Sequence, residues 1–88
     1  MRYDVIYTEK ALKSLKKLDK SILKMIKAWI DKNLVGTEDP RQLGKGLTAN
    51  RSGQWRYRVG DYRILAEIQE DKLVILVVEV GHRKNIYK

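Results

Sequence analysis

Hydrophobic and polar residues recur along the chain with two different periods. Residues 3–7, YDVIY, are rich in β-branched and aromatic types, which predicts a strand. From Ala11 to Leu18 and from Ile22 to Leu34, apolar residues return at helical spacing with lysines between them. Thr8 and Asp19 precede these two stretches as potential N-caps. Two helices joined by so few residues are expected to form an antiparallel hairpin.

The second half of the chain has the pattern of a small sheet. Gly36 and Pro40 end the second helix, and a polar loop with four of the six glycines follows as far as residue 53. Gly60 and Asp61 form a two-residue turn with glycine first, as a type II′ turn prefers. The order β-α-α-β-β-β predicts one α+β domain over residues 1–88, an antiparallel sheet with the helix hairpin on one face. The strands after the loop are expected at about 54–59, 62–69 and 72–80.

Composition narrows the classes of function. The 88 residues contain no cysteine, which excludes disulfides and thiolate zinc sites, and a single histidine, His82, which excludes a multi-histidine metal site. The longest strongly apolar run, Leu73 to Val78, is too short to span a membrane, and we expect a cytoplasmic protein. The formal net charge of +8 indicates a polyanionic partner such as RNA, DNA, the ribosome or an acidic protein; the alternative is a lysine-rich surface that only keeps the protein soluble.

The predicted hairpin gathers arginines on one face. A two-residue turn sets Arg58 opposite Arg63, and strand alternation adds Arg56 to the same side. The apolar side chains of these strands are expected to meet the helices on the other side; they are Trp55, Tyr57, Val59, Tyr62, Ile64 and Ala66.

Arg58 directly opposite Arg63 is unfavourable, because like charges across a strand pair repel. A phosphate ligand would compensate, since guanidinium groups bind phosphate oxygens in a bidentate manner. The alternative is a solvated face on which the arginines splay apart. The face has no aspartate–glutamate cluster suited to Mg²⁺, so neither metal nor cofactor is expected.

The C-terminus and the long loop supply further candidates. His82, Arg83, Lys84 and Tyr87 follow the last strand and can fold over the sheet edge. Tyr87 could stack on a base, carry a proton or cover the core edge. His82 could act as an acid or base near neutral pH or be a surface histidine. Two residues of the loop could hold an RNA backbone or be ordinary solvated positions; they are Lys45 and Arg51.

Four segments carry a family resemblance. QWRYRVGDYRI followed by VEVGHRKNIY resembles the RelE-type toxins of bacterial and archaeal toxin–antitoxin modules, and TEKALKSLKKLDKSI and EDPRQLGKGL resemble the first helix pair and the inter-element loop of that family. The resemblance implies a microbial-ribonuclease-like fold, cleavage of mRNA in the ribosomal A site, and a cognate, RelB-like antitoxin in a hetero-oligomer. Cleavage by the RNA's own 2′-hydroxyl leaves a 2′,3′-cyclic phosphate and a 5′-hydroxyl.

The resemblance also implies roles for individual residues. Arg63 and Arg83 are expected on the scissile phosphate, and Arg56 and Arg58 in orientation and charge stabilisation. Arg56 and Arg58 stand where the best-known members have lysines, and an arginine cannot serve as a general base. His82 and Tyr87 are the remaining candidates for proton transfer or base stacking.

Two other functions fit the sequence. ParE-type toxins share the fold and inhibit DNA gyrase by binding, without cleaving RNA. A plain RNA-binding module is the third possibility, but Trp55 and Tyr57 are expected to face the core, which leaves no aromatic platform for stacked bases.

Overall fold

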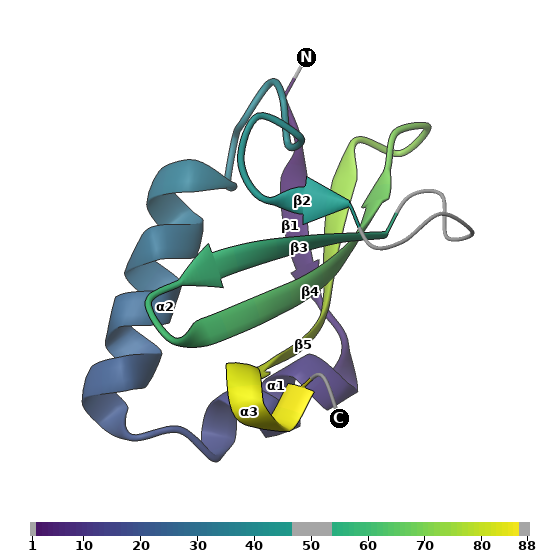
Figure 1. The fold of residues 1–88 in the computed structure, drawn as a ribbon. Helices are drawn as coiled ribbons and strands as arrows, with labels where there is room; N and C mark the ends of the chain where they lie inside the picture. Colours follow the sequence, from purple (N-terminus) through teal and green to yellow (C-terminus); the bar gives the residue numbers. More distant parts are fainter. Residues whose placement is uncertain (1, 47–53, 87–88) are drawn as a thin grey trace.

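A computed structural model describes residues 2–46 and 54–86 of the chain (Figure 1). The elements in chain order are β1 (Asp4–Tyr7), α1 (Glu9–Lys16), α2 (Lys20–Asn33), β2 (Lys45–Gly46), β3 (Gln54–Val59), β4 (Tyr62–Gln69), β5 (Val74–His82) and α3 (Arg83–Ile86). This order confirms the predicted α+β class and adds a short strand in the long loop and one helical turn in the tail. No helix in this part of the chain is long and apolar enough to cross a membrane.

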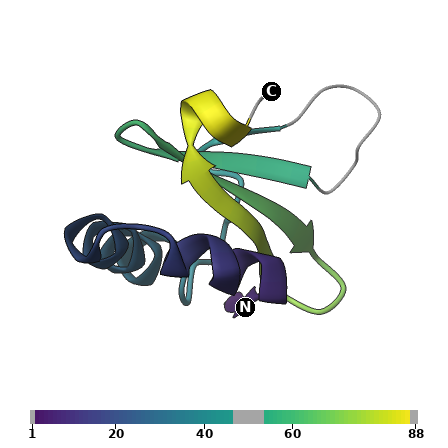
Figure 2. The same ribbon diagram turned by 90° about the horizontal axis from the view of Figure 1, so that it is seen from below.

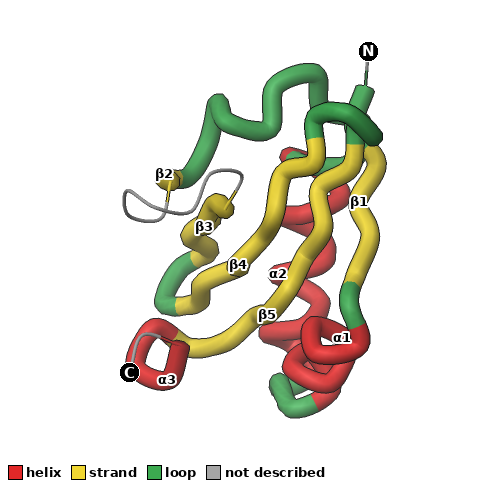
Figure 3. Tube along the Cα trace, turned by 90° about the vertical axis from the view of Figure 1, so that its right-hand side faces the viewer, coloured by secondary structure: helices red, strands yellow, loops and turns green. Residues whose placement is uncertain are grey.

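The sheet has the strand order β1-β5-β4-β3-β2 (Figure 3). The pairs β2–β3, β3–β4 and β4–β5 are antiparallel, whereas β1 pairs with β5 in parallel. The sheet is therefore mixed, whereas the sequence pattern predicted an antiparallel sheet. Parallel neighbours need a long crossover, and the two helices and the hairpin between β1 and β5 provide it.

The hairpin of β3 and β4 has the predicted register. Val59 pairs with Tyr62, and Arg58 pairs with Arg63. Gly60 has a φ of +60°, the left-handed value that the first position of a type II′ turn requires. The next connection is longer than expected, and β5 begins at Val74, because Leu73 takes a φ of +54° and packs its side chain against the core.

Both helices cover the same face of the sheet but are not side by side. Figure 2 looks nearly along α2, whereas α1 lies across the view, so the expected antiparallel helix hairpin is wrong in its geometry. Each helix buries its own apolar residues against the strands, which removes the need for a long contact between the helices. The core contains Tyr3, Ala11, Leu15, Ile26, Ile30, Leu34, Tyr57, Val59, Ile64, Ala66, Ile68, Ile75, Val77 and Val80.

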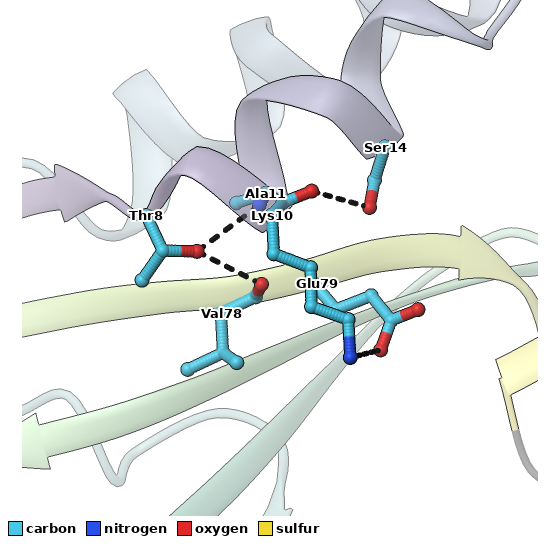
Figure 4. Close-up of polar contacts among 6 residues, drawn as sticks. All are labelled: Thr8, Lys10, Ala11, Ser14, Val78 and Glu79. Carbon is cyan, nitrogen blue, oxygen red and sulfur yellow. Dashed lines mark hydrogen bonds and ion pairs between the residues drawn. The ribbon is translucent and has the colours of Figure 1, made fainter.

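Thr8 joins the start of α1 to the centre of the sheet (Figure 4). Its hydroxyl oxygen accepts a hydrogen bond from the amide of Ala11 at 3.0 Å, the N-cap contact expected from the sequence. The same hydroxyl donates to the carbonyl of Val78 at 3.0 Å. Val78 lies at a register shift in the β4–β5 ladder, where Leu65 pairs with Glu79 and the next residue of β4 pairs with Val77. The β-bulge thus supplies the carbonyl that fixes α1 on β5.

Candidate functional site

Three arginines share the face of the sheet opposite α1 and α2. Tyr57 and Val59 are buried on the helix-covered side, so strand alternation places Arg56 and Arg58 on the other side. Arg63 joins them because it is the cross-strand partner of Arg58. The structure therefore brings together the three arginines that the hairpin pattern predicted.

The guanidinium groups of Arg58 and Arg63 converge on the tip of the hairpin. Arg58 Nε donates to the carbonyl of Gly60 at 3.3 Å, and Arg63 Nη1 donates to the same oxygen at 3.4 Å. Arg63 Nη1 also lies 3.3 Å from the carbonyl of Tyr62. No carboxylate among residues 2–46 and 54–86 forms an ion pair with either arginine. Neutral backbone oxygens thus hold two positive charges close together, which leaves their combined charge available to an anion.

Lys45 completes the cluster from the long loop. It pairs with Arg56 across the β2–β3 ladder and therefore shares the face of the arginines. A cavity of about 450 Å³ lies here, lined by Gly44, Lys45, Arg56, Tyr57, Arg58 and Arg63. We call the four cationic side chains of this cavity the cationic cluster. Guanidinium and ammonium groups arranged in this way suit the oxygens of a phosphodiester.

The segment before β2 is fixed to β3 by its aromatic residues. Trp55 Nε1 donates to the carbonyl of Leu43 at 2.6 Å, and the buried Tyr57 hydroxyl donates to the carbonyl of Pro40. The guanidinium carbon of Arg41 lies 5.7 Å from the centre of a Trp55 ring, a cation–π contact. Arg41 also forms an ion pair with Glu70 at 2.8 Å. These contacts hold the loop against the sheet edge and so position Lys45.

Burial changes the pKa of Tyr57, the tyrosine that makes one of these contacts. Burial raises the pKa of the Tyr57 hydroxyl far above its usual range; Arg41 opposes this rise and Asp39 adds to it. The hydroxyl consequently remains a neutral donor to Pro40 throughout the physiological range.

Gly44 allows the close approach of this loop. Its φ of +78° lies in the left-handed region. A Cβ at this position would lie 2.2 Å from the carbonyl oxygen of Arg56 and 2.8 Å from Trp55 Nε1. Only glycine satisfies both the conformation and the space, so this residue determines where β2 can pair.

The tail begins beside the same hairpin tip. The amide of Arg83 donates to the carbonyl of Asp61 at 2.9 Å, which ties the first residue of α3 to the β3–β4 turn. Figure 2 shows α3 on the side of the sheet opposite α1 and α2. Arg83 and Lys84 are both exposed there. The structure thus places the backbone that carries the predicted tail cations beside the turn at which Arg58 and Arg63 meet.

His82 lies on the other side of the strand. It pairs with Tyr62, and the two rings make an edge-on contact with centroids 5.4 Å apart. A second cavity of about 350 Å³ is lined by Ser14, Lys17, Leu18, Tyr62, Glu79, Val80, Gly81 and His82. His82 therefore faces α1 rather than the cationic cluster, and its Nδ1 accepts a hydrogen bond from the amide of Lys84 at 3.2 Å.

Two predicted site residues, Arg51 and Tyr87, lie outside the described residues. In the part of the chain that the structure covers, no group of three or more histidine, cysteine, aspartate or glutamate side chains could hold a metal ion.

Sequence reasoning missed the strand that carries Lys45 and the turn carbonyl shared by the two arginines. The available signal for the strand was the pair of glycines around Lys45. A Cβ on Gly46 would lie 3.2 Å from the Trp55 ring, so both glycines mark a close approach of backbone to β3.

Comparison with known proteins identifies the family. A family model described as the ParE toxin of the type II toxin–antitoxin system parDE matches residues 5–87. The chain belongs to this family. It is also 31% identical over 88 residues to Toxin RelG of Mycobacterium tuberculosis, with 100% of this chain and 99% of the relative covered. The protein is thus a toxin of the RelE/ParE superfamily of type II toxin–antitoxin systems, as the sequence resemblance indicated.

Solved structures agree with this assignment. The toxin–antitoxin complex RelBE2 of M. tuberculosis contains a chain that is 28% identical, with a TM-score of 0.83, covering 97% of this chain and 95% of its own. The isolated RelE toxin of E. coli is 25% identical, with a TM-score of 0.75, covering 97% of this chain and 90% of its own. Both matches support a RelE-like fold for this toxin.

Proposed function

We propose that this toxin is a metal-independent endoribonuclease that cleaves mRNA in the ribosomal A site and so arrests translation. The observation that carries the proposal is the convergence of Arg58 and Arg63 on the Gly60 carbonyl, beside Lys45 and Arg56 in one cavity. A phosphodiester placed in this cavity would meet several fixed cationic donors at once.

The chemistry requires little more than positioned charge. The 2′-hydroxyl oxygen of the RNA attacks the adjacent phosphorus, the bond to the 5′-oxygen breaks, and a 2′,3′-cyclic phosphate and a 5′-hydroxyl result. Arg63 and Arg83 bind the scissile phosphate and stabilise the charge that develops on its oxygens. Arg56, Arg58 and Lys45 hold and orient the RNA backbone.

The proton steps need a residue other than the arginines of the cationic cluster, because arginine stays protonated. Tyr87 is the candidate for this role, and replacing it with phenylalanine tests its hydroxyl directly. Arg51 and Lys84 are assigned to RNA backbone contacts.

The proposed partners follow from the relatives. The M. tuberculosis match was solved as a toxin–antitoxin complex. We assign to this chain a cognate RelB-like antitoxin, in a hetero-oligomer, which neutralises the toxin. The net charge of +8 favours association with the ribosome and its mRNA.

Inhibition of DNA gyrase is the second candidate function. The matched family model carries the ParE description, which favours it. The cationic cavity favours the nuclease, since a protein that inhibits gyrase by binding has no need of phosphate-directed arginines in one cavity. A plain RNA-binding module is less well supported, because Tyr57 is fully buried and Trp55 is engaged by Leu43 and Arg41.

Controlled expression of the toxin, followed by mapping of RNA ends, tests the proposal. We expect translation to stop, mRNAs to be cut within their coding regions, and the upstream fragments to end in a 2′,3′-cyclic phosphate. Coexpression of the neighbouring antitoxin gene should restore protein synthesis. Intact mRNA together with gyrase-linked DNA breaks would establish the ParE-type activity instead, and unchanged growth at good expression would contradict both.

A further inference from the structure

His82 stands at the junction between the sheet and the tail. It is the last residue of β5, its ring contacts the edge or face of Tyr62 at an interplanar angle of 80°, and its Nδ1 accepts the Lys84 amide at 3.2 Å. The amide of the intervening Arg83 is bonded to the Asp61 carbonyl at 2.9 Å. The hydrogen bonds of two consecutive amides, Arg83 to the Asp61 backbone and Lys84 to the His82 side chain, therefore set the direction in which the tail leaves the sheet.

The contact with Lys84 is the geometry of a helix N-cap. A cap residue stands before the first helical residue, and its side chain accepts a hydrogen bond from the amide two or three positions later. His82 occupies this position relative to α3, with an imidazole nitrogen in the place of the usual oxygen. To accept this bond Nδ1 must be unprotonated, which places the proton of the neutral ring on Nε2.

We propose that His82 is a positioning residue, which caps the tail turn in its neutral form and thereby directs Arg83 to the phosphate, and that protonation of Nδ1 releases this turn. The inference rests on the proposed ribonuclease function for its effect on rate, but the cap itself is independent of that function. It gives His82 a role other than proton transfer to RNA, consistent with its ring facing α1.

The surroundings of the ring determine how protonation acts. Glu79 lines the same cavity, but it forms an ion pair with Lys10 at 3.3 Å. A proton on Nδ1 would point at the Lys84 amide hydrogen, so the contact would change from attractive to repulsive. The titratable groups that line this cavity with the imidazole are Lys17 at the end of α1, Tyr62 of β4 and Glu79 of β5, and the backbone amide of Lys84 contacts Nδ1.

Two substitutions distinguish a role of His82 as a helix cap from a role as a proton carrier. His82→Asn keeps a side-chain acceptor of the kind preferred at N-caps but cannot be protonated in its place. His82→Phe keeps an aromatic ring against Tyr62 and loses the acceptor. Hydrogen exchange of the Lys84 amide, followed by NMR, measures the cap, and single-turnover cleavage of mRNA on programmed ribosomes measures the reaction.

We expect His82→Asn to retain the protection of the Lys84 amide and to cleave at near the parent rate. His82→Phe should lower that protection by about 2- to 30-fold, the worth of one cap. It should lower the rate of bound-substrate cleavage by about 10- to 100-fold with a smaller change in KM, because Arg83 is misplaced rather than lost. On acidification, parent activity and Lys84 protection should fall together, whereas His82→Asn should lack this acidic limb.

Three results would overturn the proposal. An inactive His82→Asn variant with a protected Lys84 amide would identify the imidazole as a proton carrier. A His82→Phe variant with parental activity and protection would show that no cap is needed. A Lys84 amide whose exchange is the same in the parent and both variants would remove the cap itself, even if no cleavage of RNA were found. Absence of cleavage by the parent, with the predicted protection pattern intact, would contradict the ribonuclease function while leaving the cap standing.

Discussion

Arg58 and Arg63 are direct cross-strand partners whose side chains donate to one and the same acceptor, the carbonyl of Gly60. The two positive charges therefore do not splay apart into solvent; they turn toward the tip of the hairpin. A single neutral oxygen does not cancel two charges, so the repulsion persists in the free protein. Local repulsion that a bound anion relieves is typical of a functional site.

Removing one charge of this pair should stabilise the free toxin. We expect Arg58→Gln to raise the free energy of unfolding by about 0.2–1 kcal/mol, because a like-charge pair across two strands disappears. Cleavage should become slower at the same time. Urea unfolding followed by circular dichroism measures the first effect. Arg41→Gln is the matched control: it loses the ion pair with Glu70 and the contact with Trp55, and should destabilise the protein. Destabilisation by Arg58→Gln would mean that its bond to Gly60 outweighs the repulsion.

Arg63 should be essential to the reaction but not to the fold. Its side chain points away from the helix-covered core, so Arg63→Ala removes little packing. Loss of one donor to a developing oxyanion typically lowers the rate on the order of 10²–10³-fold. Single-turnover cleavage on programmed ribosomes measures this loss, with circular dichroism as the folding control.

Two further variants provide cleavage rates with which the rate of Arg63→Ala can be compared. Arg56→Ala should lower the rate less than Arg63→Ala if Arg56 only orients the RNA backbone. Arg2→Ala removes the same charge from an exposed position outside the cavity and should leave cleavage unchanged. A folded Arg63→Ala protein that cleaves near the parent rate would show that the cavity is not the phosphate site.

We expect Gly44 to be needed for activity, because it allows the loop to approach β3 and so places Lys45 in the cavity. Gly44→Ala forces a Cβ to within 2.2 Å of the Arg56 carbonyl oxygen, so β2 must leave β3 and Lys45 must leave the cavity. Gly36→Ala is the matched control, because Gly36 has a similar φ of +75° but nothing within 4 Å of the added Cβ. We expect Gly36→Ala to cost about 1–2 kcal/mol from its left-handed conformation alone, with cleavage retained. Gly44→Ala should be more destabilised and should cleave poorly. Equal effects of the two changes on stability and rate would contradict this role of the loop.

We expect the free energy of unfolding to decrease at alkaline pH because of the raised pKa of Tyr57. Burial raises the pKa of its hydroxyl in the folded protein, so the unfolded chain loses this proton first as the pH rises. The stabilisation is complete below about pH 10, the ordinary value for an exposed tyrosine, and is lost as the pH rises beyond it. Tyr57→Phe should cost about 0.5–1.5 kcal/mol at neutral pH, through loss of the bond to Pro40, and should flatten the alkaline slope.

A comparison of urea unfolding at neutral and alkaline pH tests this prediction. Burial and the nearby Asp31 also raise the pKa of Tyr7, so Tyr7→Phe should remove a smaller part of the same slope. An alkaline slope that is unchanged in Tyr57→Phe would show that other groups cause it.

The sequence by itself determined the local geometry of the site. Alternation along a strand and a two-residue turn with glycine first are short-range constraints, and together they determine which side chains share a face. They correctly predicted that Arg58 faces Arg63 and that Tyr57 is buried. Helical spacing and the Thr8 cap likewise predicted where α1 begins.

Contacts between distant segments required the tertiary structure. The parallel pairing of β1 with β5, the crossing of the two helices and the placement of Lys45 opposite Arg56 all join residues separated by loops. A loop leaves many pairings open, and the choice among them depends on packing, such as the approach of Gly44 to Trp55 and the bonds that anchor Leu43 and Pro40. The same holds for His82: its position after β5 is evident from the sequence, but the face to which its ring turns depends on the register with Tyr62 across the bulged ladder.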